Sequence, residues 1–149
     1  MGPTLNDNYS KRAAFVAGLV LWPLCAFAAD THPTPPSAAV EQLIDEALVG
    51  VPGKEILMLT VEYLPGGASL PHRHDAQVFV YVLQGELTMQ VAGSPAVTLR
   101  QGETFYENPG DVHVVSANAS KTAPAKFLVF MVKDKGAPVS REVSRRGTL

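Results

Sequence analysis

The sequence has little of several features that would point to particular classes of protein. Its 149 residues contain one cysteine, Cys25, and aromatic residues make up only 7%. No repeat with a period of roughly 20–50 residues is apparent, which argues against a solenoid or a propeller. Lysine and arginine total 12 against 14 acidic residues, a formal net charge of −2. A chain this close to neutral gives no reason to expect nucleic acid or an anionic membrane as its partner.

The first 28 residues are predicted to be a signal peptide. Lys11 and Arg12 form a positive start, an uncharged run follows, and Ala26-Phe27-Ala28 supplies the small residues of a cleavage site. The apolar run is shorter than the roughly 20 residues that a membrane-spanning helix needs, although an uncleaved anchor is the alternative. We therefore predict cleavage after Ala28 and a periplasmic or secreted protein that does not associate with the membrane after cleavage.

Cleavage would remove Cys25 and leave a mature chain without cysteine. Such a chain has no disulfide, so core packing alone must hold it together. Thiolate chemistry is also excluded, both for a nucleophile and for a soft metal ligand. The length is enough for one domain with one core.

The segment before residue 55 is predicted to hold a proline-rich leader and a short helix. Ser37 could cap this helix, and Val40, Leu43 and Ile44 recur at helical spacing before Gly50. The predicted organisation is a signal peptide (1–28), leader and short helix (29–54), barrel (55–133) and C-terminal tail (134–149).

From residue 55 the sequence consists of short strand-like runs separated by turn residues. Their spacing of about 8–12 residues is typical of an all-β sandwich or barrel. The run at 78–83 is apolar throughout, which predicts a strand buried on both faces. The expected strands are 55–63, 78–83, 87–91, 96–99, 104–106, 113–116 and 127–133.

Three histidines carry the most specific chemical signal. His72 and His74 are two residues apart, so in a strand both side chains point to the same side. His113 would come from a separate strand, while His32 lies in the leader. Three imidazoles can hold one divalent first-row metal and leave positions open for water or substrate. We predict that His72, His74 and His113 bind a metal.

The residues around these histidines resemble the two motifs of the cupin family. The first motif matches at Gly66, His72, His74 and Gly85, and the second at Gly102, Gly110 and His113. The resemblance covers roughly residues 55–132. It implies a double-stranded β-helix (jelly-roll) barrel with a metal in its mouth and a small-molecule ligand, often assembled as a homodimer.

The chain departs from the cupin pattern where the metal-binding glutamate is expected, because that position is Val78. Gln77 is adjacent and could supply an amide oxygen through a bulge. The second motif also has Pro109 shifted and its asparagine one place late, at Asn118. Three neutral ligands would leave the site with a charge near +2, which favours an anionic substrate or hydroxide. Iron, zinc, nickel, copper and manganese all remain open.

Four further residues are secondary candidates for the site. Glu107 precedes the second-motif turn, and Glu62, Tyr81 and Tyr106 lie in predicted strands. An unpaired buried carboxylate is costly, so Glu62 on an otherwise apolar strand would need a reason.

Two classes of function fit these observations. The first is a metalloenzyme acting on a small organic molecule by oxygen activation or by lyase or isomerase chemistry. The three-histidine arrangement also resembles that of the cupin thiol and diketone dioxygenases. The second is a non-catalytic module that binds a small molecule or a metal, since one fold hosts many functions. A decayed cupin without a metal is a third interpretation.

Overall fold

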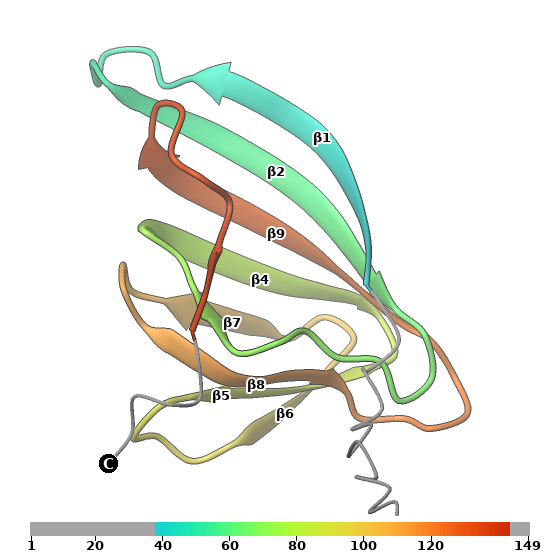
Figure 1. Ribbon diagram of the computed structural model, residues 1–149. Helices are drawn as coiled ribbons and strands as arrows, with labels where there is room; N and C mark the ends of the chain where they lie inside the picture. Colours follow the sequence, from blue (N-terminus) through green and yellow to red (C-terminus); the bar gives the residue numbers. More distant parts are fainter. Residues whose placement is uncertain (1–37, 144–149) are drawn as a thin grey trace, which may run out of the picture. The chain divides into compact units, whose positions relative to one another are not determined.

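Residues 38–143 form ten β-strands in two five-stranded antiparallel sheets (Figure 1). The computed structural model describes these residues and leaves 1–37 and 144–149 outside the description, so the predicted signal peptide lies outside the described residues. Within residues 38–143, no helix is long and apolar enough to cross a membrane. The two sheets confirm the predicted all-β jelly roll.

The strand order brings together segments that are far apart in the sequence. All seven strands expected from the sequence are present, with ends that differ by a few residues. The first sheet runs β1 (Ala39–Ala47), β2 (Lys54–Tyr63), β9 (Ala125–Asp134), β4 (Ala76–Gln84) and β7 (Thr104–Glu107). The second runs β10 (Arg141–Glu142), β3 (His72–Arg73), β8 (Val112–Asn118), β5 (Glu86–Val91) and β6 (Val97–Arg100).

The core lies between the sheets and is built from alternate residues of the strands. Side chains two apart in a strand point to one face, so each strand contributes every second residue. Burying an aliphatic or aromatic side chain stabilises the fold by about 1.5–3 kcal/mol relative to leaving it exposed. The buried apolar residues include Leu57, Leu59, Val61, Tyr63, Val78, Val80, Val82, Leu87, Met89, Phe127, Val129 and Met131.

The prediction that residues 78–83 are buried on both faces is wrong. Val78 and Val80 point into the core, but Phe79 and Tyr81 are 43% and 44% exposed on the outer face of β4. Within the described chain no second layer covers this face, so the strand alternates although its sequence is apolar throughout.

The predicted short N-terminal helix is also wrong. Residues 39–47 form β1, which pairs with β2 from Ala39 opposite Glu62 to Ala47 opposite Glu55. A helix of this length without a packing partner is marginal in water. As a strand, the same residues hydrogen-bond to the open edge of β2. Every side chain of β1 is exposed, so pairing of the backbone, not burial of an apolar face, decides the conformation.

Candidate metal centre

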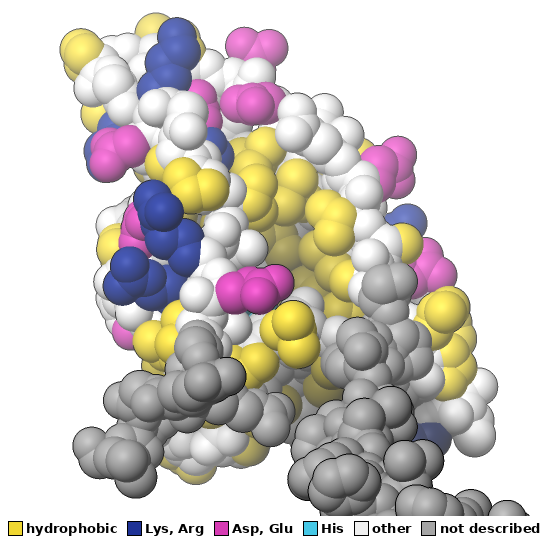
Figure 2. All heavy atoms as spheres, in the orientation of Figure 1, with side chains coloured by type: hydrophobic (Ala, Val, Ile, Leu, Met, Phe, Trp, Pro, Cys, Tyr) yellow, Lys and Arg dark blue, Asp and Glu magenta, His cyan; other side chains and the backbone are white. Residues whose placement is uncertain are grey.

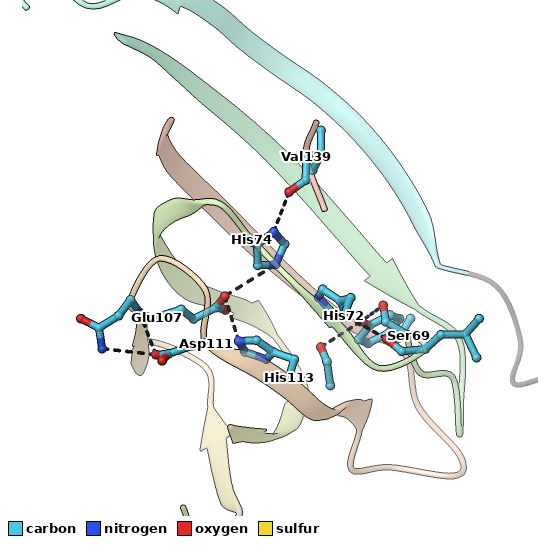
Figure 3. Close-up of polar contacts among 11 residues, drawn as sticks. Ser69, His72, His74, Glu107, Asp111, His113 and Val139 are labelled. Carbon is cyan, nitrogen blue, oxygen red and sulfur yellow. Dashed lines mark hydrogen bonds and ion pairs between the residues drawn. The ribbon is translucent and has the colours of Figure 1, made fainter. Parts of the chain in front are cut away.

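The three predicted histidines lie close together with one carboxylate, Glu107 (Figure 3). His72 on β3 is the direct partner of His113 on β8, which places these two rings on neighbouring strands. His74 follows β3 immediately, and Gly110 donates a backbone hydrogen bond to its carbonyl (2.8 Å). The second-motif turn is thus attached to the first motif.

Two of the histidines are oriented by backbone carbonyls. Nδ1 of His72 lies 2.7 Å from the carbonyl of Leu70, and Nδ1 of His74 lies 2.6 Å from that of Val139. A protonated Nδ1 donating to a carbonyl leaves Nε2 with a free lone pair. This outer contact is the one that usually fixes a metal-binding imidazole in place. Burial lowers the pKa of His72, which favours the neutral ring that a metal needs.

The other two residues are buried and lack hydrogen-bond partners. His113 and Glu107 are 1% and 2% exposed. The carboxylate oxygen Oε2 of Glu107 lies 2.8 Å from Nε2 of His113 and 3.6 Å from Nε2 of His74. Nevertheless, this oxygen and both ring nitrogens of His113 make no hydrogen bond. A buried polar atom without a hydrogen bond costs about 1–3 kcal/mol. Among the described residues, Oε2 of Glu107 and Nε2 of His113 have only their close contact with each other and the longer contact with His74, so a further partner would stabilise them.

A divalent metal fits this need. Ligand atoms about 2.1 Å from one ion lie roughly 3 Å apart, which is close to the separation of Glu107 Oε2 and His113 Nε2. The ring centroids of the three histidines are 4.9, 5.3 and 6.0 Å apart. Among residues 38–143, no three His, Cys, Asp or Glu side chains are arranged to hold a metal ion in their present positions. Metal binding would therefore require the side chains to rotate toward a common point.

Glu107 brings a carboxylate next to Val78, the position at which the cupin pattern has a glutamate. The two residues are direct partners across β4 and β7, and both are buried on the inner face of the sheet. A carboxylate in the ligand set would bring the charge of a dication site from +2 to +1. This removes the reason for expecting an anionic substrate.

The remaining candidates lie elsewhere. Gln77 is exposed on the face of β4 opposite to Val78, and β4 has no bulge there, so its amide is not brought to the histidines. Tyr81 and Tyr106 are exposed on the outer face of the same sheet. Glu62 is half-buried between Val61 and Tyr63, whose side chains point inward, so its own side chain points outward.

The segment after β9 crosses from the first sheet to the second, where β10 pairs with β3 (Figure 1). Besides the carbonyl of Val139, the backbone NH of Val143 bonds to the carbonyl of Pro71 (2.9 Å). Arg141 donates to Asp75 (2.7 Å), and this bond lowers the pKa of that carboxyl. We call residues 135–143 the strap. Three bonds thus join it to the segment that carries His72 and His74.

A buried ion pair holds the base of the strap. Lys133 and Glu55 are both largely buried and form a charge-assisted hydrogen bond. Lys133 also donates to the carbonyl of Ala137 (2.8 Å), and Gly136 donates its NH to Glu55 (3.1 Å). The pair therefore fixes where the strap leaves the first sheet.

Replacing Lys133 by methionine should destabilise the fold several times more than the same change at Lys54, whose pair with Asp134 lies at the surface. Surface pairs contribute about 0–1 kcal/mol. Removing one partner of a buried pair instead leaves an uncompensated charge. Urea unfolding of both variants at pH 7 measures the difference, and equal losses would contradict the prediction.

The same pair predicts a pH dependence. The hydrogen bond from Lys133 lowers the pKa of Glu55 below its ordinary value of 4.5. The unfolded chain then binds this proton more readily, so the stabilisation is complete above about pH 4.5 and is lost as the pH falls through the lowered pKa. The stability difference between wild type and Lys133→Met should shrink below pH 4.5. A difference that grows in acid would contradict the assignment.

A small apolar cavity lies beside the histidines. Figure 2 shows hydrophobic side chains gathered around a hollow in one face of the molecule. The cavity has a volume of about 130 Å³. His72, His74 and Glu107 line it together with Tyr63, Ser69 and Ser116, and the rest of its described wall is largely aliphatic or aromatic: Ala38, Val40, Leu59, Val61, Val78, Val80, Met89, Phe127, Val129, Val139 and Ser140.

Comparison with known proteins agrees with the fold. The cupin domain family model matches residues 59–131. Residues 59–131 are thus similar to a cupin domain, and the two-sheet barrel is the fold that this similarity implies. None of the curated proteins matches the sequence.

Solved structures with the same fold include an enzyme. The DMSP lyase DddQ from Ruegeria pomeroyi DSS-3 is 21% identical with a TM-score of 0.59. The alignment covers 74% of this chain but only 54% of the lyase. A cupin-like protein from Thermotoga maritima is 20% identical (TM-score 0.57, 72% of this chain and 76% of that one). A cupin 2 conserved barrel domain protein from Rhodopseudomonas palustris is 16% identical (TM-score 0.58, 80% and 75%).

Proposed function

We propose that this cupin binds one divalent transition metal through His72, His74, His113 and Glu107, and that it is an enzyme acting on a small organic molecule. The observation that carries the proposal is the set of buried atoms without hydrogen bonds, Oε2 of Glu107 and both ring nitrogens of His113, with Oε2 only 2.8 Å from Nε2. Keeping such groups unpaired in a protein interior is costly. A bound metal would satisfy Oε2 and one ring nitrogen.

The ligand set agrees with the metals named from the sequence. Imidazole and carboxylate together suit iron, zinc, manganese, nickel and copper. A metal bound there would act as a Lewis acid toward an oxygen of the substrate. The chain itself would contribute the orientation of His72 and His74 through their carbonyl contacts and a largely apolar cavity beside them.

The adjoining cavity favours an enzyme or a small-molecule binder over a protein that only stores metal, because a storage site needs no apolar space beside it. Oxygen uptake with phenolic, diketone or thiol substrates would identify an oxygenase. Conversion of a substrate under nitrogen would identify lyase or isomerase chemistry, the former being what DddQ is named for.

Replacing Glu107 by glutamine tests the proposal at its least expected ligand. The change keeps the shape but removes the charge, and we expect metal affinity to fall by at least the roughly 10–100-fold seen when an outer-shell partner is lost. Titration of chelator-treated full chain with zinc and with manganese, followed by calorimetry, measures the affinities.

The matched control is Gln77→Ala, at the residue that the sequence offered as a fourth ligand. Gln77 is exposed on the other face of β4, so its removal should leave metal affinity within twofold of wild type. A loss with Gln77→Ala and none with Glu107→Gln would reverse the assignment. A wild-type chain that takes up no metal would contradict the proposal as a whole.

Secretion through a cleaved signal peptide and assembly as a homodimer remain part of the proposal. Both rest on the sequence and on its cupin resemblance. The signal peptide lies outside the described residues.

A further inference from the structure

Three hydroxyl groups form a cluster in the wall of the cavity. The hydroxyl of Tyr63 lies 2.5 Å from Oγ of Ser69 and 3.0 Å from Oγ of Ser116. Tyr63 and Ser116 are buried, at 1% and 5% exposure. In Figure 3, Ser69 is drawn beside His72 and on the side away from Glu107. The cluster and the carboxylate thus lie toward opposite ends of the histidine group.

The cluster has one hydrogen more than its internal bonds can use. Three hydroxyls carry three hydrogens, and each of the two internal bonds uses one. These oxygens make no other side-chain hydrogen bond among the described residues. One hydrogen and several lone pairs therefore remain available to a molecule in the cavity. The hydroxyls bond to one another, and the hydrogen left over would bond best to an oxygen of a molecule in the cavity.

Charge and volume restrict what that molecule can be. No lysine or arginine is among the described residues that line the cavity, so apart from the proposed metal nothing there would neutralise an anionic group. A volume of about 130 Å³ is close to that of an engineered cavity of roughly 150 Å³ that holds benzene. It is too small to enclose a nucleotide or an oligosaccharide.

We infer that the Tyr63–Ser69–Ser116 cluster is a ligand subsite, and that the cavity takes a compact, uncharged molecule of about one ring whose far end is a hydroxyl or carbonyl oxygen. The inference rests on the proposed function only for the near end of the ligand, which would face the metal. Tyr63 is then a specificity-determining residue, because it bonds to both serines and holds the cluster together.

The test uses two probes of nearly equal size, phenol and toluene, with chelator-treated full chain. Phenol should bind more tightly than toluene, and Tyr63→Phe should lower phenol affinity about three- to tenfold, the value of one neutral hydrogen bond. Toluene affinity should stay within twofold, which also shows that the cavity is intact. Benzoate, which would place an unpaired carboxylate in the cavity, should bind at least tenfold more weakly than phenol.

Ser116→Ala provides a second variant and should lower phenol affinity in the same direction without affecting toluene. Equal losses for phenol and toluene, no loss in either variant, or benzoate binding as tight as phenol would overturn the inference. Repeating the titrations with zinc-loaded protein separates the two proposals. If the metal proposal alone fails, adding zinc changes neither affinity, while Tyr63→Phe still weakens phenol binding and leaves toluene binding unchanged. If the subsite proposal alone fails, zinc binds, but Tyr63→Phe does not weaken phenol binding selectively.

Discussion

A chain carrying His72→Ala and His74→Ala together is expected to bind no metal, while the wild type binds one ion per chain. The two rings are 4.9 Å apart, and their Nδ1 atoms are already engaged by carbonyls, so both Nε2 atoms are available. Losing two of four ligands should lower affinity by well over 100-fold, beyond the roughly 10–100-fold effect of losing an outer-shell contact. Metal analysis of natively secreted protein, with calorimetry on the chelator-treated chain, measures both quantities.

The same experiment has a thermal readout. A metal that binds only the folded chain stabilises it by about 2.7 kcal/mol at a free concentration of 100 times Kd. The wild type should therefore melt at higher temperature when zinc is added, and the double variant should not respond. Arg73→Ala is the matched control, because Arg73 lies between the two histidines and is exposed. Unchanged metal content in the double variant would exclude the three-histidine site.

Replacing Gly85 by alanine should cost about 2–4 kcal/mol of the free energy of unfolding. Gly85 lies between β4 and β5 with φ at +76°, a conformation that L residues rarely adopt. A Cβ there would also lie 2.6 Å from the carbonyl oxygen of Pro124 and 3.0 Å from Cα of Ala125. Both contacts are with backbone, which can move only if the connection into β9 shifts.

Gly93→Ala separates the cost of the positive φ from the cost of the steric clash. Gly93 has a similar φ of +82°, but a Cβ there would meet nothing within 4 Å. The Gly93→Ala variant should therefore lose only the part of the free energy of unfolding that comes from the positive φ, about 1–2 kcal/mol. Urea unfolding with matching slopes for all three chains gives the comparison. Equal losses at the two glycines would show that the close approach at Gly85 is relieved without cost.

The interpretation of the strands was largely correct because the barrel is built from local signals. Turn residues and β-branched runs mark each strand, and these are properties of a few neighbouring positions. The failures at residues 39–47 and at the outer face of β4 both depend on elements elsewhere in the chain. Residues 39–47 form a strand because they pair with the edge of β2, and the outer face of β4 is exposed because no described element covers it. Nothing in the local sequence records either fact.

The residues of the site also fall into those that the local sequence predicts and those that only the tertiary structure reveals. His72, His74 and His113 could be predicted because motif spacing and the two-residue strand period are both visible in the sequence. Glu107 could be named only as a secondary candidate, because its pairing with Val78 joins two strands that lie far apart in the chain. The Tyr63 hydroxyl cluster could not be found at all. Its three members come from three separate segments, and each resembles an ordinary polar residue in its own strand or loop.

The sequence by itself determined the all-β class, seven of the ten strands and three of the four proposed ligands, because alternation and motif spacing act over short distances. Only the tertiary structure decided that Glu107 faces the position left empty by Val78, that Gln77 points away and that hydroxyls line the cavity. These features depend on strand register, and register is set by closure of the whole barrel.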